Sequence, residues 1–276
     1  MSRKVWVAAA AVAVVAVGAL LWWQRQAPPP AQPVELPAPA PAPVVAAPAS
    51  TPASAPAPAI LHPIEPPAVA EPAAPADIST ALIDLFGRKA ALSMFQVDDF
   101  ARRLVATVDN LARAHAPSRL WPVNTSSGRF IVEHRDGSDI VGADNGLRYT
   151  PFVLLIETVD MRQAVATYVR MYPLFQQAYE DLGYPKKYFN DRLVEVIDLL
   201  LATPEVDGPL KVHLPQINGP LQPERPWVLY EFDDPALQSL SAGQKILVRI
   251  GPVNERRMKA KLAEIRRLVT ASAPAR

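Results

Sequence analysis

Apolar residues follow one another without a charged interruption over residues 5–23, near the start of the chain. As a helix that rises about 1.5 Å per residue, this run is about 28 Å long, close to the hydrocarbon thickness of a bilayer. Trp6 lies near one end and Trp22 and Trp23 at the other, where indole rings favour the headgroup layer. The pattern therefore predicts a transmembrane helix over residues 5–23.

The charges beside this run predict its orientation. Arg3 and Lys4 precede it and only Arg25 follows it closely, so the positive-inside bias places residues 1–4 in the cytoplasm. A cleaved signal peptide is the alternative, but cleavage needs small residues directly after the apolar run, where this chain has tryptophan, glutamine and arginine. We expect an uncleaved, single-pass signal anchor. The Ala/Pro bias of the chain and its short Arg-Lys start are common in exported bacterial proteins, so the expected membrane is a bacterial inner membrane, with the rest of the chain in the periplasm.

A different pattern begins near residue 77, where apolar positions recur every three or four residues, as on one face of a helix. Helix-capping residues or prolines precede several of these stretches. We expect the first helix to continue through Leu92, and Pro173 predicts a break inside a later one. The expected caps or first residues of the helices are Asp77, Asp98, Thr150, Asp160, Asn190, Asp234 and Pro252.

Strand signals are few and short. Asp136–Gly137 is typical of a two-residue hairpin turn, and residues 129–135 and 138–142 are expected to pair on either side of it. Two further short strands are expected over residues 210–214 and 227–232. The fold class is therefore mainly α with a small β-hairpin or sheet element, that is, α+β with minor β.

Composition separates this domain from the apolar run. Residues 24–76 consist mainly of Pro and Ala, which cannot bury enough apolar surface to offset the entropy of ordering. We expect a disordered tether there, biased to polyproline II, with a reach on the order of 150 Å when extended. It carries one helical globular domain, residues 77–270, which a disordered tail, 271–276, follows. The tether is either a device for reach or a generic spacer.

Residues that carry chemistry are sparse. The chain has no Cys, which excludes disulfides and a lipidated cysteine. We find no phosphate-binding glycine loop, no nucleophile elbow and no metal-ligand spacing. His134 is expected to face Asp139 across the hairpin, and His213 is expected in an apolar strand, as a core histidine and not as a ligand. The sequence assigns no catalytic residue, cofactor or metal, and whether the protein is an enzyme stays open; the alternative to a binding function is an envelope hydrolase that uses carboxylates around Glu157 or Glu231.

Two groups of residues are candidates for binding a partner. The first follows a Gly-Tyr-Pro turn and combines aromatic, amide, acidic and basic side chains, although Asn190 is also expected to cap a helix and Arg192 to pair with a carboxylate. The second lies in the last helix, because residues 245–276 hold nine basic and two acidic residues in a chain of net charge +1. Such a helix could recognise an anionic lipid, polymer or partner, although cations near a helix C-terminus are also ordinary. The candidates are Tyr188, Asn190, Asp191, Arg192, Arg256, Arg257 and Lys259.

Three phrases of the sequence are distinctive: YPLFQ at residues 172–176, YFNDRLVEVID at 188–198 and LSAGQK at 240–245. With them, the region from about residue 100 to 267 resembles the bacterial family catalogued as domain of unknown function 3014. The resemblance implies a bacterial, usually proline-rich and membrane-anchored protein. The family has no assigned activity and offers no functional residues to transfer.

These observations predict an anchored interaction or adaptor module. The domain is expected to bind an envelope protein or a cell-wall polymer, and no nucleic acid, while residues 5–23 hold it in the inner membrane. The sequence leaves the partner's identity and the oligomeric state open.

Overall fold

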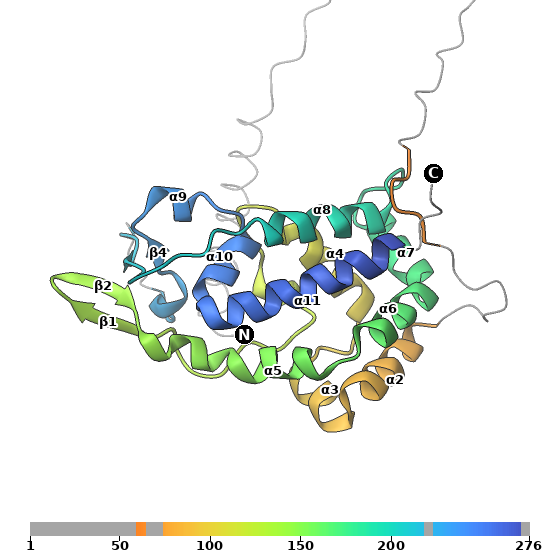
Figure 1. Ribbon diagram of the computed structural model, residues 1–276, viewed down its shortest axis with the longest axis horizontal. Helices are drawn as coiled ribbons and strands as arrows, with labels where there is room; N and C mark the ends of the chain where they lie inside the picture. Colours follow the sequence, from red (N-terminus) through yellow and green to blue (C-terminus); the bar gives the residue numbers. More distant parts are fainter. Residues whose placement is uncertain (1–58, 65–73, 218–222, 272–276) are drawn as a thin grey trace, which may run out of the picture. The chain divides into compact units, whose positions relative to one another are not determined.

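The computed structural model describes residues 59–64, 74–217 and 223–271 (Figure 1). The expected transmembrane helix, most of the expected tether and residues 272–276 lie outside this part of the chain. Over the described ranges, no helix is both long and apolar enough to cross a membrane. The described residues are mainly helical with two small antiparallel sheets, as the sequence predicted.

Two of the expected helix starts near the beginning of the domain were placed wrongly. The first expected helix is divided at Gly87 into α2 (Pro75–Phe86) and α3 (Arg88–Met94), because Gly87 has a φ of 77°, which only glycine adopts easily. Asp77 does not cap α2; it is the third helical residue, and its carboxylate accepts a hydrogen bond of 2.8 Å from the Ala74 N–H. The helix α4 (Phe100–Leu111) starts one residue later than expected, after Asp99.

The middle helices agree closely with the sequence pattern. The α5 helix (Thr150–Thr158) contains Pro151 in its first turn, and α6 (Met161–Arg170) is capped by Asp160, whose carboxylate accepts from two backbone N–H groups. The α7 helix (Tyr172–Asp181) follows after a break at Met171, as Pro173 predicted.

The last helices include one that the sequence did not predict. After α8 (Phe189–Leu201), the short α9 (Pro235–Gln238) is capped by Asp234 as expected. The unpredicted α10 (Ala242–Arg249) begins with a capping box, in which the Ser241 hydroxyl and the Gln244 amide each accept from the other residue's N–H. The chain then enters α11 (Pro252–Ala271), the longest helix of the described residues.

The strands form two ribbons at one end of the helices (Figure 1). In the predicted hairpin, β1 (Val132–Arg135) pairs with β2 (Ser138–Val141), and the turn residues Asp136 and Gly137 both have positive φ, as a type I′ turn requires. The second ribbon pairs β3 (Val212–His213) with β4 (Glu231–Phe232), which are shorter than expected. Three 3₁₀ turns complete the described elements: η1 (Ser118–Leu120), η2 (Ala143–Arg148) and η3 (Pro226–Val228).

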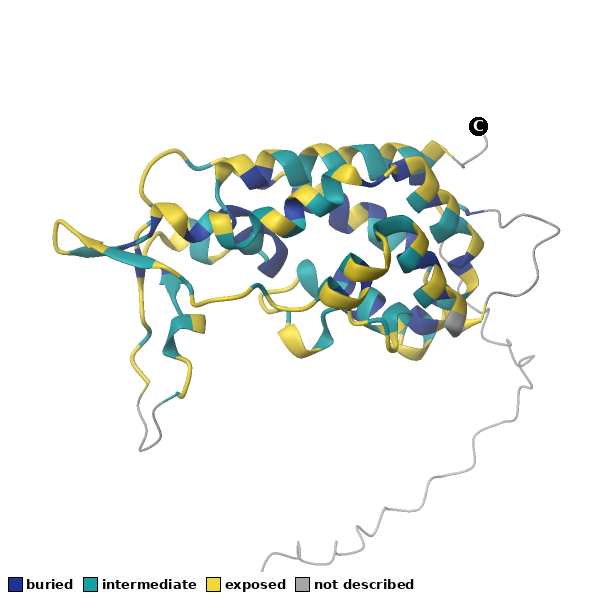
Figure 2. Cartoon of the chain, turned by 90° about the horizontal axis from the view of Figure 1, so that it is seen from below, coloured by how far each residue is buried: buried dark blue, intermediate teal, exposed yellow. Residues whose placement is uncertain are grey.

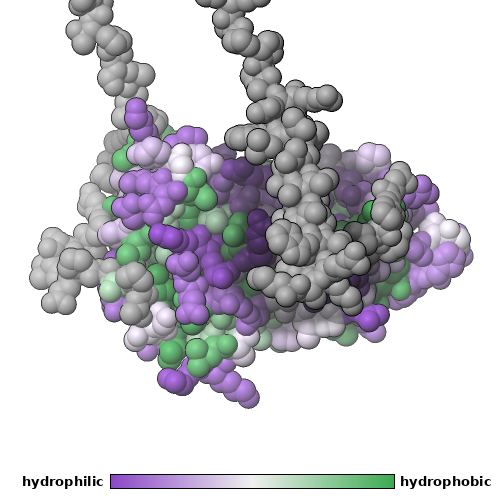
Figure 3. Space-filling model, turned by 180° about the vertical axis from the view of Figure 1, so that it is seen from behind, coloured by the Kyte–Doolittle hydropathy of each residue, from purple (hydrophilic) through white to green (hydrophobic). Residues whose placement is uncertain are grey.

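The apolar core lies between the helices. The α11 helix contacts α5, α6, α8 and α10, while α4 contacts α7, α8 and α10. Buried positions lie where the helices face one another, and the β1–β2 hairpin projects from the helical body with little burial (Figure 2). On the face drawn in Figure 3, hydrophilic side chains alternate with smaller apolar groups. Residues 59–64, part of the expected tether, lie against this helical body. The Ile64 side chain is part of its main core.

Candidate functional site

The clearest binding arrangement in the described residues holds a piece of the chain itself. Residues 59–64, the docked segment, lie against the start of α8 beside the end of α11 (Figure 1). The domain side of this contact consists of Tyr188, Asn190 and Asp191, which we call the segment site. Three of the seven candidate residues from the sequence therefore meet in one place.

Asp191 binds the segment through its charge. Its two carboxylate oxygens accept hydrogen bonds of 3.0 Å and 2.7 Å from the consecutive N–H groups of Leu61 and His62. Asp191 also lies in the first turn of α8, where a negative charge is favoured by the helix dipole. Hydrogen bonds to a charged acceptor are stronger than neutral ones, so this residue contributes strongly to the contact.

Asn190 is fully buried and does not cap α8, in contrast to the expectation from the sequence. The helix starts at Phe189, so Asn190 is already its second residue and its amide points inward. Its Nδ2 donates to the carbonyl oxygens of His62, at 2.9 Å, and Val269, at 3.4 Å, while its Oδ1 accepts from the Tyr168 hydroxyl. Asn190 thus ties the docked segment to the end of α11.

Tyr188 completes the site at the far end of the segment. Its hydroxyl accepts a 2.7 Å hydrogen bond from the Ile64 N–H and donates to the Ile64 carbonyl at 3.3 Å. The Tyr188 ring packs against Tyr172, with 5.1 Å between the ring centroids. The Ile64 side chain is only 6% exposed and joins the main core.

The α7 helix holds the site in position. The Phe189 N–H donates to the Gln176 Oε1 at 2.9 Å, and the Asn190 N–H donates to the Tyr172 hydroxyl at 3.1 Å. These bonds satisfy two N–H groups at the start of α8 that have no partner within the helix. Burial raises the pKa of Tyr172 far above the usual value, so its hydroxyl stays neutral and available for these contacts.

Arg192, the fourth candidate of this group, points away from the docked segment. It pairs with a carboxylate as expected: its Nε donates to Asp109 at 3.1 Å, and its other guanidinium nitrogens reach the Asp109 carbonyl and Glu195. Asp109 is 3% exposed and also binds Arg113 and the Tyr184 hydroxyl. Burial alone would lower the pKa of Arg192, but Glu195 and Asp109 raise it. This group joins α4 to α8 and is structural.

The three basic candidates of the last helix are not gathered into one surface. Arg256 lies 3.6 Å from Glu205, and Arg257 lies 3.7 Å from Glu157. Lys259 is largely buried, where its Nζ lies 2.8 Å from Glu255 and donates to the Thr203 carbonyl. These three cations of the last helix therefore pair with acidic groups of the same domain.

The groups considered for chemistry are dispersed. His134 lies 3.1 Å from Asp139, as predicted, on the exposed hairpin. His213 is not a core residue, because its side chain is 52% exposed and contacts Asp233 and Glu231. Glu157, on α5, faces Arg257 instead of a second carboxylate. In the described ranges, no three His, Cys, Asp or Glu residues gather as metal ligands would.

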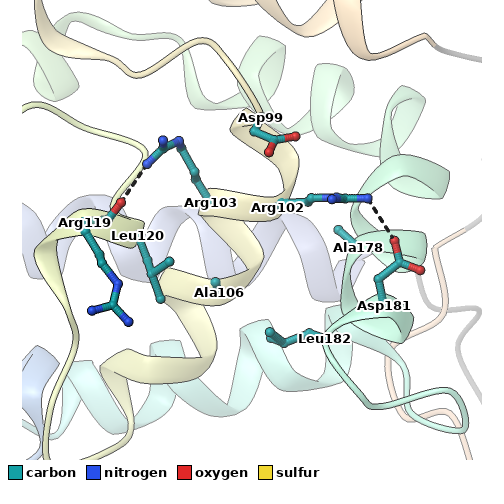
Figure 4. A pocket seen from close by; sticks show the side chains of 9 residues that line it. All are labelled: Asp99, Arg102, Arg103, Ala106, Arg119, Leu120, Ala178, Asp181 and Leu182. Carbon is teal, nitrogen blue, oxygen red and sulfur yellow. Dashed lines mark hydrogen bonds and ion pairs between the residues drawn. The ribbon is translucent and has the colours of Figure 1, made fainter. Parts of the chain in front are cut away.

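A shallow pocket of about 570 Å³ lies between α4, η1 and α7 (Figure 4). Arg102, Arg103 and Arg119 line its walls around an apolar floor. Two of these cations are already engaged, since Arg102 lies 3.5 Å from Asp181 and Arg103 donates to the Arg119 carbonyl. The pocket therefore has mixed charge, and we assign it no ligand.

The sequence interpretation missed the ligand-like role of residues 59–64. A signal was present: Ile60, Leu61 and Ile64 place three large aliphatic residues within five positions, unlike any other stretch of residues 24–76. The proline-rich composition around them led to the prediction of a disordered tether instead. In the same way, the prediction that Asn190 caps a helix left out its part in the site.

Comparisons with known proteins agree with the resemblance seen in the sequence. Neither the curated proteins nor the solved structures include a match to this chain. A family model does match, over residues 100–266, which is more than half of the chain and includes α4 to α10 and about three quarters of α11. The chain therefore belongs to the family described as "Protein of unknown function (DUF3014)".

Proposed function

We propose that this protein is an anchored interaction module of the bacterial cell envelope. In this proposal residues 5–23 hold it in the inner membrane with its N-terminus in the cytoplasm, and the proline-rich tether presents the domain in the periplasm. The support is the bilayer-length apolar run, the charges beside it and the Pro/Ala composition that follows. Tethering raises the local concentration of the domain near a partner, so a modest affinity is sufficient.

The segment site is the observation that carries the binding function. Tyr188, Asn190 and Asp191 contact the docked segment through its backbone N–H and C=O groups, with one buried side chain, Ile64. Recognition of main-chain groups together with one apolar anchor is a common way to bind a polypeptide segment. The proposed partner is therefore an envelope protein with such a segment, in preference to a cell-wall polymer.

The anchor is tested by fractionation of cells. The full chain should sediment with the inner membrane, and a chain that lacks residues 5–23 but keeps an export signal should be soluble in the periplasm. A reporter enzyme active only outside the cytoplasm, fused after residue 276, should be active on the full chain. Recovery of the full chain in the cytoplasm would contradict the proposal.

The binding function is tested by capture from envelope extracts and from purified cell wall, at low and high salt. The bait is the full chain in detergent, compared with Asp191→Asn, which removes the charged acceptor of the segment site. Asp181→Asn is the matched control, because Asp181 is an exposed acid on α7 paired with Arg102. The proposal expects a protein that Asp191→Asn loses and Asp181→Asn retains, confirmed with the purified partner. Equal capture by the native chain and both variants would show that the interaction does not use the segment site.

A further inference from the structure

We propose that the segment site binds a four-residue stretch of a partner protein in which the first two residues supply N–H groups, the third tolerates proline and the fourth is aliphatic, and that residues 59–64 are a built-in competitor for the same site. This inference rests on the proposed function, because it names the partner's chemistry and adds a control on access to it. Residues 61–64, Leu-His-Pro-Ile, meet these requirements.

Contacts from the rest of the domain also hold the residues of the segment site. The Asn190 amide is held by the Tyr168 hydroxyl and the Val269 carbonyl, and the start of α8 is held by Tyr172 and Gln176. Asp191 lies in the first turn of α8, which these contacts fix. The groups that receive a peptide are therefore preorganised, which lowers the cost of binding a second one.

The contacts define which groups of a peptide the segment site recognises. Asp191 requires two consecutive N–H groups, Asn190 requires the carbonyl after them, and Tyr188 requires the N–H and C=O of the last residue. The third position makes none of these bonds, so proline, which has no N–H, loses nothing there. The last side chain enters the apolar core, as Ile64 does. The histidine at the second position takes part in these bonds only through its backbone N–H and C=O groups.

The docked segment is attached weakly enough to exchange. Ile60 and Leu61 are 47% and 64% exposed, and Ile64 is the one buried residue of the segment. Nine residues separate Ile64 from Ala74, where the described chain resumes. At about 3.3 Å each they span up to about 30 Å, so the segment can leave while the domain stays folded. A competitor on the same chain acts at millimolar effective concentration, which weakens external binding until a partner offers a better segment.

The test measures binding of a labelled peptide with the sequence of residues 59–64, acetylated and amidated, to the full chain in detergent. Two variants release the built-in competitor in different ways: Ile64→Asp removes the apolar anchor, and His62→Pro removes one N–H that Asp191 binds. Asp191→Asn disables the site itself. Circular dichroism confirms that each variant is folded. A control peptide that carries Asp in its last position tests the need for an aliphatic residue.

We expect both releasing variants to bind the peptide at least about tenfold more tightly than the native chain. Asp191→Asn and the control peptide should each lose most of the binding. If the native chain and both folded releasing variants bind the peptide equally, the built-in competition is wrong while the site's role as a peptide receptor stands. If no variant binds the peptide, this inference fails; the capture experiment then decides separately whether Asp191 serves an interaction of another kind.

Discussion

At the scale of single residues, the buried acid Asp109 has more influence on stability than any exposed ion pair. It faces Arg192 and Arg113 and accepts from Tyr184, with its own side chain almost wholly buried. Removing one member of such a pair leaves a buried charge without compensation. Exposed pairs such as Arg102–Asp181 contribute little, because water and salt screen them.

Asp109→Asn should therefore lower the free energy of unfolding by about 3 kcal/mol, somewhat moderated by Glu195, which keeps its contact with Arg192. Asp181→Asn, the exposed counterpart, should change it by less than about 1 kcal/mol. Urea unfolding of the two variants beside the native domain measures both values. Equal effects would show that the Asp109 group is not the structural joint between α4 and α8.

The pKa of Tyr179 predicts a loss of stability in alkali. Burial, helped by the nearby charge of Asp109, raises this pKa from 10.0 to about 12. Between these values the unfolded chain releases the phenolic proton and the folded chain keeps it, so stability present below pH 10 is lost as pH rises. A shift of this size corresponds to about 2 to 3 kcal/mol. Urea midpoints measured across this range should fall more steeply for the native domain than for Tyr179→Phe, whereas parallel curves would refute the role of Tyr179.

At the scale of elements, Gly243 sets how closely α10 approaches its neighbours. A Cβ built at this position would lie 3.0 Å from the Leu111 carbonyl oxygen of α4 and 2.6 Å from a Leu200 methyl group of α8. The Leu200 side chain can move, but the Leu111 backbone cannot move without shifting α4. The close packing of α10 against α4 and α8 therefore requires glycine at position 243, within the phrase LSAGQK.

Gly243→Ala should destabilise the domain by about 1 to 3 kcal/mol, because the added methyl group overpacks the junction. Helix propensity alone predicts the opposite sign, a gain of up to about 1 kcal/mol. The sign of the change in thermal or urea unfolding therefore decides between the two effects. A stabilised variant would mean that α10 can move away from α4 at little cost.

The elements also show how far sequence reasoning extends. Caps with a single local role, such as Asp160 and Asp234, were predicted correctly, because their hydrogen bonds lie within three residues of the chain. The hairpin turn was predicted for the same reason. Asn190 was misjudged because its partners, Tyr168, His62 and Val269, come from three distant segments. The α10 helix was not predicted because its buried face includes Gly243, Gln244 and Lys245, which do not mark a core-facing position in the sequence.

At the scale of the whole molecule, the docked segment extends the folded unit beyond the family's matched region. The five hydrogen bonds and the burial of Ile64 stabilise the contact. Ordering six residues of a flexible chain costs on the order of 1 kcal/mol or more per residue, which offsets most of this gain. The net contribution to the stability of the domain should therefore be small.

A chain of residues 65–276 should accordingly remain folded and be only about 1 to 3 kcal/mol less stable than one of residues 59–276. Far-ultraviolet circular dichroism and urea unfolding of the two chains measure this difference. Loss of cooperative unfolding in the shorter chain would show that the segment is an obligatory part of the fold, and it would remove the basis for exchange.

The docked segment also determines where mechanical load enters the domain. A pull on the chain before residue 59 arrives first at the start of α8, not at α2, because the segment is fastened there. Its bonds to Asp191, Asn190 and Tyr188 follow one another along the chain. They therefore open in succession, as in peeling, with Ile64 released last. Undocking lengthens the connection to α2 before α2 bears the force, so the contact with α8 takes up the first load and releases the segment before the pull reaches α2.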